Sequence, residues 1–278
     1  MRHNILIPTD FSENAWSAAK YAIELYANEP CTFYFSHAWT FLNLGSRTYI
    51  SPEYVDPLKD EAKKQLAELK KQAKKETSNS EHKFETIFGL GSLEDTIQYA
   101  IKKQKIDLVV MGTKGATGAK KVLFGSNTVA AINKVRLCPF LLVPSNYEYE
   151  VPENICFPTK LNRFYNEELL PLKKIAELHN SKIKIFHIKV KDKITTKQTK
   201  NLEQLKSYFV NDVYDVNWKP KSGKKEQAIT EFIEEKNINI LTMINYKHSF
   251  VANLIKEPII KKMGFHSRIP FLVIPSVD

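Results

Sequence analysis

The sequence predicts an α/β protein of two tandem Rossmann-like domains, each with a five-stranded, mostly parallel sheet and helices on both faces. Three observations indicate this fold: strand-like and helix-like patterns alternate, strand-like runs are largely apolar, and the order of landmarks occurs twice. The chain has 278 residues, of which 43% are hydrophobic and 26% charged, as in ordinary globular proteins. This length is enough for two domains that each bury a core.

Short apolar runs in the first half predict the strands. The run at residues 107–111 is almost wholly apolar after its first residue, which is typical of a strand that helices cover on both faces. We expect strands at residues 3–8, 32–37, 84–88, 107–111 and 140–143.

Apolar residues at helical spacing predict the helices between these strands. Ser12 is a suitable N-cap for a helix that runs to about Tyr26, and Ser92 with Asp95 forms a variant of the capping box for a helix that runs to about Lys103. The last helix is expected from Ser126 to Arg136. One stripe marks a long amphipathic helix, and it consists of Leu58, Ala62, Leu66, Leu69 and Ala73.

The second half of the chain repeats the landmarks of the first. The segment at residues 4–9 is echoed at 154–159, and His37 is echoed by His187, each about 150 residues further on. Because this period is far longer than that of solenoid repeats, it predicts a duplicated domain. We place the domains at residues 1–146 and 147–278, the second with a shorter second helix over about 197–211. Two further pairs of runs match, 106–111 with 238–243 and 138–144 with 269–275.

The composition excludes several classes of protein. No apolar run approaches the ~18 residues of a membrane span, and the N-terminus carries no signal-peptide pattern, so we expect no membrane association and a soluble, cytoplasmic protein. Cys31, Cys138 and Cys156 form no CxxC pair, which argues against a zinc site or a disulfide framework. The net charge of +10 is spread over both halves and accompanies no nucleic-acid motif, so nucleic-acid binding is not favoured.

Ligands of such sheets bind beyond the carboxyl ends of the strands, at the topological switch point. This rule singles out Thr9 and Asp10, which follow the first strand, and Met111 and Gly112, which end the fourth. A glycine-rich segment then leads into a helix at Ser126. Glycine lets a ligand approach the backbone closely, and the free N–H groups at a helix start bind anions. The segment therefore predicts a phosphate-binding site.

The spacing Gly112-x2-Gly115-x9-Gly125-Ser126 resembles the nucleotide loop of the universal stress protein family, in its ATP-binding branch. The whole chain resembles a tandem two-domain member of that family. The resemblance implies binding of ATP, or of ADP or AMP, with Mg²⁺ as an accompanying ion. It places Asp10 at the adenine end, Ala38 beside the base, Gly112 near the ribose, and the remaining glycines with Ser126 and Asn127 on the phosphates. The candidate binding residues are Thr9, Asp10, Ala38, Met111, Gly112, Lys114, Gly115, Gly125, Ser126 and Asn127.

Some candidates have a structural alternative. Asp10 is also suited to help cap the following helix, and Ser126 is also suited as an N-cap. Lys114, Lys120 and Lys121 can also be solvent-exposed side chains that contact no phosphate. The repeat of His37 and His187 favours packing at a strand end over metal ligation. The dinucleotide fingerprint and the P-loop pattern are both absent from the sequence.

The second half departs from the nucleotide pattern. Lys160 stands where the first half has Asp10, residues 244–247 replace 112–115, and residues 256–258 replace 125–127 with bulky or acidic side chains and a proline. We therefore expect no nucleotide in the second domain. The family resemblance implies antiparallel pairing of the last strands, 141–143 with 272–274, as an intramolecular pseudo-dimer. Association of whole chains into a homodimer stays open.

Three function classes follow. The favoured one is a nucleotide-dependent stress-response or regulatory module with slow or no ATP hydrolysis, because no Asp, Glu or His lies between Gly112 and Thr128 to position a water. The second is an adenine-nucleotide hydrolase or transferase. The third is a basic scaffold that binds nucleic acid or protein.

Overall fold

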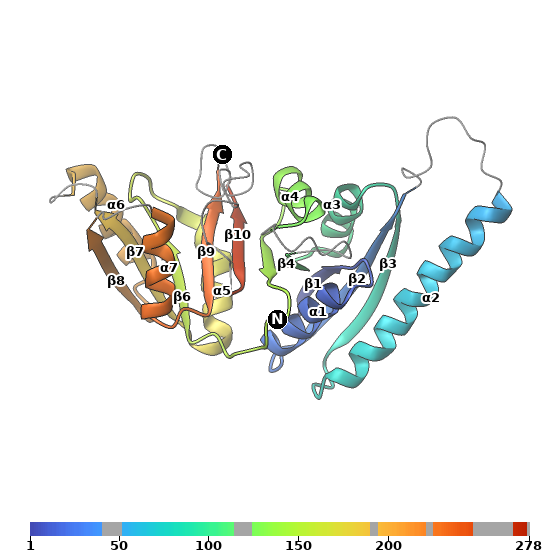
Figure 1. Cartoon of the computed structure of the whole chain (residues 1–278). Helices are drawn as coiled ribbons and strands as arrows, with labels where there is room; N and C mark the ends of the chain where they lie inside the picture. The colour runs from blue at the N-terminus through green and yellow to red at the C-terminus, as the bar shows by residue number, and fades with distance from the viewer. Residues whose placement is uncertain (41–51, 114–123, 190–193, 221–224, 247–268, 277–278) are drawn as a thin grey trace. The chain divides into compact units, whose positions relative to one another are not determined.

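The computed structural model describes residues 1–40, 52–113, 124–189, 194–220, 225–246 and 269–276 (Figure 1). The chain divides into two compact units. The described residues of the first unit lie within residues 1–148, and those of the second lie within residues 149–278. Within the described ranges, no helix combines the length and apolarity that a bilayer span requires.

Strands and helices alternate along the first unit, as the sequence predicts. The strands are β1 (His3–Pro8), β2 (Cys31–Trp39), β3 (Lys83–Leu90), β4 (Leu108–Gly112) and β5 (Phe140–Val143). The helices are α1 (Glu13–Leu25), α2 (Pro52–Glu76), α3 (Leu93–Gln104) and α4 (Ser126–Lys134).

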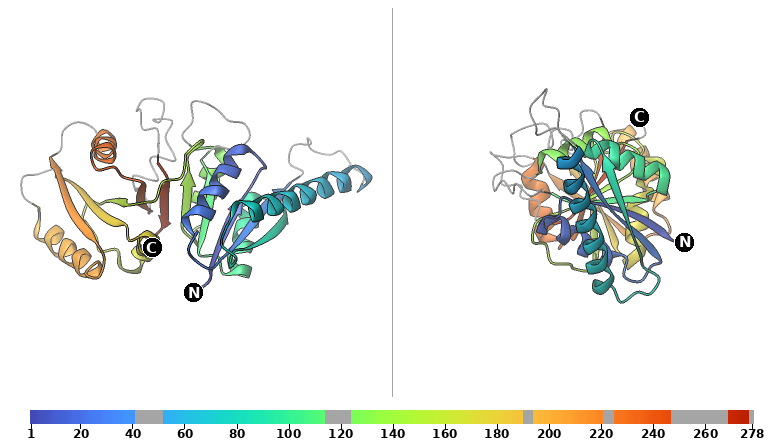
Figure 2. Two further views of the ribbon diagram at one scale, coloured as in Figure 1. Left: turned by 90° about the horizontal axis from the view of Figure 1, so that it is seen from below. Right: turned by 90° about the vertical axis from the view of Figure 1, so that its right-hand side faces the viewer.

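The strands of the first unit form a parallel sheet in the order β3-β2-β1-β4-β5. The chain moves from β1 outward to β3 and then returns to β4, so the topological switch point lies between β1 and β4. Right-handed crossovers place α1 and α2 on one face of this sheet and α3 and α4 on the other (Figures 1 and 2). This arrangement is the α/β fold that the alternating pattern predicts.

The centre of the first sheet forms the core of the unit. Ile5, Leu6 and Ile7 of β1 are fully buried, and every residue of β4 is buried. Both strands are therefore covered on both faces, as their apolar sequences predict. Helix α1 begins where expected, since the Oγ of Ser12 accepts a hydrogen bond from the N–H of Ala15 (3.2 Å).

Two details of the helices differ from expectation. Helix α4 ends at Lys134 and not at Arg136, because Val135 already has an extended backbone (φ −95°, ψ 105°). On α2, Leu66 and Ala73 of the predicted stripe are buried, but Leu58 is 46% exposed. Figure 2 shows the N-terminal end of α2 running out beyond the strands, which leaves this part of the stripe uncovered.

The second unit has its own parallel sheet in the order β8-β7-β6-β9-β10. Its strands are β6 (Asn154–Pro158), β7 (Lys182–Lys189), β8 (Tyr214–Pro220), β9 (Ile240–Asn245) and β10 (Phe271–Pro275). Its helices are the 3-10 helix η1 (Asn166–Leu169), α5 (Leu170–His179), α6 (Thr196–Tyr208) and α7 (Lys225–Glu235). Helix α6 is the short second helix predicted over about 197–211.

Candidate functional site

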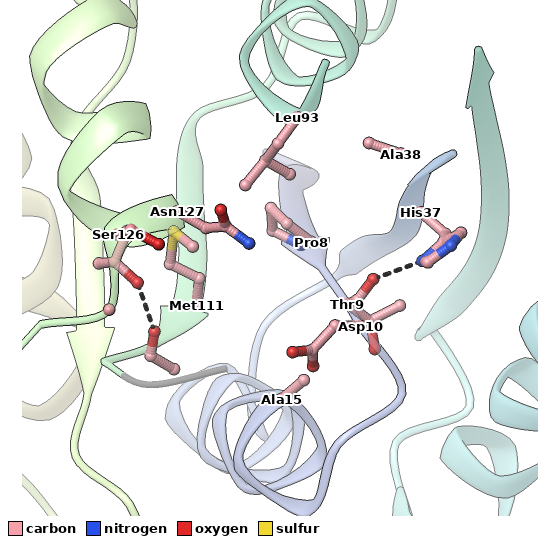
Figure 3. Close-up of a pocket in the computed structure, with 13 residues that line it drawn as sticks. Pro8, Thr9, Asp10, Ala15, His37, Ala38, Leu93, Met111, Ser126 and Asn127 are labelled. Carbon is pink, nitrogen blue, oxygen red and sulfur yellow. Dashed lines mark hydrogen bonds between the residues drawn. The ribbon is translucent and has the colours of Figure 1, made fainter. Parts of the chain in front are cut away.

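A cavity of about 240 Å³ lies at the carboxyl ends of β1 and β4, at the switch point of the first sheet (Figure 3). Residues at the ends of three strands and at the starts of three helices line it. They are Pro8, Thr9, Asp10, Ala15, His37, Ala38, Leu93, Met111, Gly112, Gly125, Ser126, Asn127 and Thr128.

This cavity brings together the predicted binding residues that the structure describes. They are Thr9, Asp10, Ala38, Met111, Gly112, Gly125, Ser126 and Asn127. Figure 3 shows Asp10 close to Ala15 at the start of α1, with Ser126 and Asn127 at the start of α4. The predicted residues Lys114 and Gly115, like Lys120 and Lys121, fall outside the described residues.

Helix α4 presents an uncapped N-terminus to the cavity. Its N-cap is Gly125 (φ −63°, ψ 157°), which makes no side-chain cap hydrogen bond. The suggestion that Ser126 is itself the N-cap is therefore wrong, because Ser126 is already the first residue of the helix. The backbone N–H groups of Ser126 and Asn127 belong to a first helical turn, where N–H groups have no partner within the helix. Such a turn, with its helix dipole, favours an anion.

Hydrogen bonds tie the start of α4 to the end of β4. The N–H of Gly125 donates to the carbonyl oxygen of Thr113 (2.7 Å), and the N–H of Thr113 donates to that of Val143 (3.0 Å). The Oγ1 of Thr128 donates to the carbonyl oxygen of Gly112 (3.2 Å), one of the bonds drawn in Figure 3. These contacts hold both ends of the glycine-rich segment beside the cavity.

Asp10 has the capping role that the sequence suggests as its alternative. One carboxylate oxygen, Oδ1, accepts hydrogen bonds from the N–H (3.1 Å) and the Oγ–H (2.6 Å) of Ser12, which in turn caps α1. The residue is nevertheless exposed and lines the cavity. Support of the cap and contact with a ligand are therefore compatible at this position.

His37 holds the turn that follows β1. Its Nδ1 lies 2.8 Å from the carbonyl oxygen of Thr9, so Nδ1 carries the hydrogen and donates it. The ring also packs on Phe11, with the ring centroids 4.5 Å apart. These contacts confirm a packing role at the strand end. Among the described residues, no group of three or more His, Cys, Asp or Glu side chains is arranged to hold a metal ion.

Several lining residues were not among the candidates from sequence. They are Pro8, Ala15, His37, Leu93 and Thr128. Pro8 and His37 lie near strand ends, so the rule that selected Thr9 and Met111 also applies to them. The sequence has no comparable signal for Ala15 and Leu93, because their place at the cavity depends on how α1 and α3 pack.

Bulky side chains stand at the corresponding place in the second unit. Tyr165 matches Ala15 in the sequence repeat, although it stands just before η1 and not inside a helix, and its hydroxyl lies 2.7 Å from the Oγ1 of Thr159. Burial raises the pKa of Tyr165 to about 12. The guanidinium of Arg163 lies 5.1 Å from the ring centroids of both Tyr165 and Tyr246. It also pairs with the buried carboxylate of Glu168.

A parallel α/β sheet with a cavity at its switch point, bordered by a bare helix N-terminus, defines the class of Rossmann-like α/β proteins. Residues 1–144 match the sequence model of the universal stress protein family, which is more than half of the chain. The chain belongs to the universal stress protein family.

Known relatives agree with this assignment. Universal stress protein MJ0531 of Methanocaldococcus jannaschii is 36% identical over 145 residues, which cover 50% of this chain and 80% of that protein. Universal stress protein YxiE of Bacillus subtilis is 24% identical over 148 residues, 51% of this chain and 99% of that protein. A universal stress protein from Archaeoglobus fulgidus has a similar fold, with a TM-score of 0.73 at 18% identity over 98% of both chains.

Proposed function

We propose that the first unit binds an adenine nucleotide, ATP or else ADP or AMP, in the cavity between β1 and β4. The observation that carries this proposal is the uncapped start of α4 at Gly125, which lies on that cavity and ends a glycine-rich segment of the family's ATP-binding spacing. Mg²⁺ would accompany the phosphates.

The proposed roles combine the family resemblance with the described lining of the cavity. The N–H groups of Ser126 and Asn127 hold the phosphates, because free amides and the dipole of α4 attract negative charge, and Gly115 and Gly125 let the phosphates approach the backbone. Lys114 adds positive charge near them. Met111 and Gly112 lie near the ribose. At the other end of the nucleotide, Thr9, Asp10 and Ala38 surround the adenine.

We propose that residues 1–146 and 147–278 are duplicated domains and that the second has lost its nucleotide site. Equivalent internal contacts support the duplication. The N–H of Asn4 donates to Asp107 (2.9 Å) and that of Asn154 donates to Asn239 (3.0 Å). The loss is supported by the buried Tyr165, which matches Ala15 in the sequence repeat, and by Lys160 in place of Asp10.

The biological role proposed for the chain is a nucleotide-dependent regulatory module of the stress response, in the cytoplasm, with slow or no hydrolysis. The described lining of the cavity offers Asp10 as its acidic residue, and this carboxylate lies at the adenine end of the proposed pose, away from a γ-phosphate. In this proposal the last strands of the two domains pair as a pseudo-dimer, and homodimers of the whole chain are a further form.

The decisive experiment counts the nucleotide that the protein carries. The purified full chain is denatured, and the released nucleotide is identified by mass spectrometry and quantified per chain. One adenine nucleotide per chain is expected. Two per chain would show that the second domain has kept a site, and none, even after incubation with excess ATP, would overturn the proposed site.

A further inference from the structure

The first turn of α3 packs against β3 at a position that has no room for a side chain. Gly89, near the end of β3, pairs in register with Ala38 of β2, which lines the cavity at the switch point. A Cβ atom at Gly89 would lie 2.2 Å from the Oγ1 of Thr96, 2.6 Å from its Cγ2 and 2.9 Å from its Cβ. Because real Cβ atoms essentially never have contacts below 3.0 Å, any other residue at this position would displace Thr96.

Glycine is costly inside a strand, since it loses much backbone freedom on folding and offers no side chain to pack. A left-handed backbone is not what requires it at Gly89, which lies within the extended backbone of β3. Gly91, two residues further on, does have a positive φ (128°), and the space around it is open. The requirement at Gly89 is therefore the close approach of α3.

Thr96 is buried and fixed within the first turn of α3. Its N–H (3.1 Å) and its Oγ1–H (3.0 Å) both donate to the carbonyl oxygen of Ser92. The Oγ of Ser92 caps the helix by accepting a hydrogen bond from the N–H of Asp95 (3.1 Å). Two of the three substituents on the Thr96 Cβ face Gly89, so every staggered rotamer leaves a heavy atom there. A methyl group at Gly89 would therefore displace the whole turn.

The same turn carries Leu93 to the cavity. Leu93 is the first residue of α3, and its half-buried side chain lines the cavity. Figure 3 shows this side chain directed from the start of α3 into the cavity. Residues three apart in a helix stand on one face, so a shift of Thr96 also shifts Leu93. The apolar surface of Leu93 suits the face of a base better than a charged phosphate.

The second unit has a long side chain at the position of Gly89. Gly89 follows the strand partner of His37, and Lys219 follows the strand partner of the equivalent His187. The Nζ of Lys219 pairs with the carboxylate of Glu231 on α7 (2.5 Å). The unit whose nucleotide site we propose to be lost therefore also lacks the glycine that lets the helix approach the strand.

We propose that Leu93 contacts the base of the bound nucleotide and that Gly89 is its positioning residue. The missing Cβ lets the first turn of α3 lie against β3, and this packing holds Leu93 on the base beside Ala38. The inference deepens the nucleotide site of the proposed function and rests on it. A methyl group at Gly89 should therefore disturb the base contact and leave the phosphate contacts at α4 unchanged.

Titration calorimetry of the full chain with ATP and with inorganic tripolyphosphate tests the proposal. Gly89→Ala should weaken ATP binding about tenfold, while tripolyphosphate, which has no base, should bind within about twofold of the unchanged protein. Leu93→Ala should show the same selective loss, because it removes the base contact directly. A general loss of structure would weaken the binding of both ligands alike.

Relief of the clash provides the matched control. Thr96→Ala removes the Oγ1 and the Cγ2, which leaves only the Cβ at 2.9 Å and needs a far smaller shift of the helix. The double variant Gly89→Ala/Thr96→Ala should therefore recover ATP affinity to within about threefold of Thr96→Ala alone.

Three results would overturn the proposal. They are normal ATP affinity in Leu93→Ala, equal weakening of ATP and tripolyphosphate by Gly89→Ala, and no recovery in the double variant. Leu93→Ala decides the base contact even if Gly89→Ala fails to fold. If the unchanged protein binds no ATP, the proposed function fails as well. If it binds ATP and the variants bind ATP equally well, this inference alone fails.

Discussion

The Nδ1 atom of His37 lies 2.8 Å from the carbonyl oxygen of Thr9, and the Nδ1 of His187 lies 2.8 Å from that of Thr159. In each unit this contact joins the end of the second strand to the turn after the first. In the first unit the turn carries Asp10 to the edge of the cavity. The same hydrogen bond therefore holds the turn at the edge of the cavity in the first unit and the turn beside the buried Tyr165 in the second.

Loss of this contact should have different effects in the two units. His37→Ala should lower the free energy of unfolding by about 1 kcal/mol and weaken nucleotide binding several-fold, because the Thr9 turn loses a hydrogen bond. His187→Ala is the matched control and should cost similar stability with unchanged nucleotide affinity. Urea unfolding and titration calorimetry measure both effects. Equal losses of affinity in the two variants would contradict the assignment of the site.

The Asp10→Asn variant separates the two roles of Asp10, which are support of the α1 cap and contact with a ligand. In Asp10→Asn the side-chain oxygen still accepts the hydrogen bonds of Ser12, so the thermal midpoint should stay within about 2 °C of the unchanged protein. Nucleotide affinity should fall several-fold, because the proposed contact of the carboxylate with the adenine end of the nucleotide is lost. Asp10→Ala should lower both the thermal midpoint and the nucleotide affinity. If Asp10→Asn bound nucleotide normally, the carboxylate would serve the cap alone.

The second unit indicates how the cavity of the first can be closed. Ala15→Tyr introduces at the cavity the residue that stands at position 165, and it should abolish nucleotide binding while the chain stays folded. Ala15→Ser, which adds only a hydroxyl, is the control and should retain binding. Calorimetry and circular dichroism distinguish the outcomes. A folded Ala15→Tyr chain that still carries one nucleotide would place the ligand elsewhere.

The ion pair between Glu94 and Lys134 should make the free energy of unfolding depend on pH. The hydrogen bond from Lys134 (2.7 Å) lowers the pKa of Glu94 below its ordinary 4.5, although burial opposes this shift. Because the folded pKa is the lower one, ionised Glu94 stabilises the fold above pH 4.5, and this contribution is lost as the pH falls through the folded pKa.

Urea unfolding of the unchanged protein and of Glu94→Gln at pH 7 and at pH 3 tests this expectation. Glu94→Gln should be less stable at pH 7, and the difference should shrink at pH 3. Lys134→Met should likewise be less stable than the unchanged protein at pH 7, and this difference should also shrink at pH 3. A difference that is the same at both pH values would mean that the pair contributes nothing through ionisation.

The elements of the fold could be predicted because their signals are local. The apolar run at Val109 and Val110, the cap at Ser12 and the helical spacing of Ala18 and Ala22 each reflect burial or hydrogen bonding within a few residues. Element ends were less accurate. Helix α4 starts at Ser126 as predicted, but it ends at Lys134 and not at Arg136, because the backbone of Val135 is already extended.

Much of the candidate site could also be predicted, since parallel strands bring their carboxyl ends to one edge of a sheet. Thr9 and Met111, far apart in the chain, therefore both line the cavity. The places of Ala15 and Leu93 had no such signal, because they depend on how α1 and α3 pack against the sheet.

The alternation of strands and helices, the repeat of landmarks and the residues at the strand ends can be read from the chain alone, because hydrophobic periodicity and turn chemistry act over short stretches of chain. The cavity beside Ala15 in the first unit and the burial of Tyr165 in the second follow only from packing. Such spaces depend on the volumes of side chains that meet from distant segments, and no single segment encodes them.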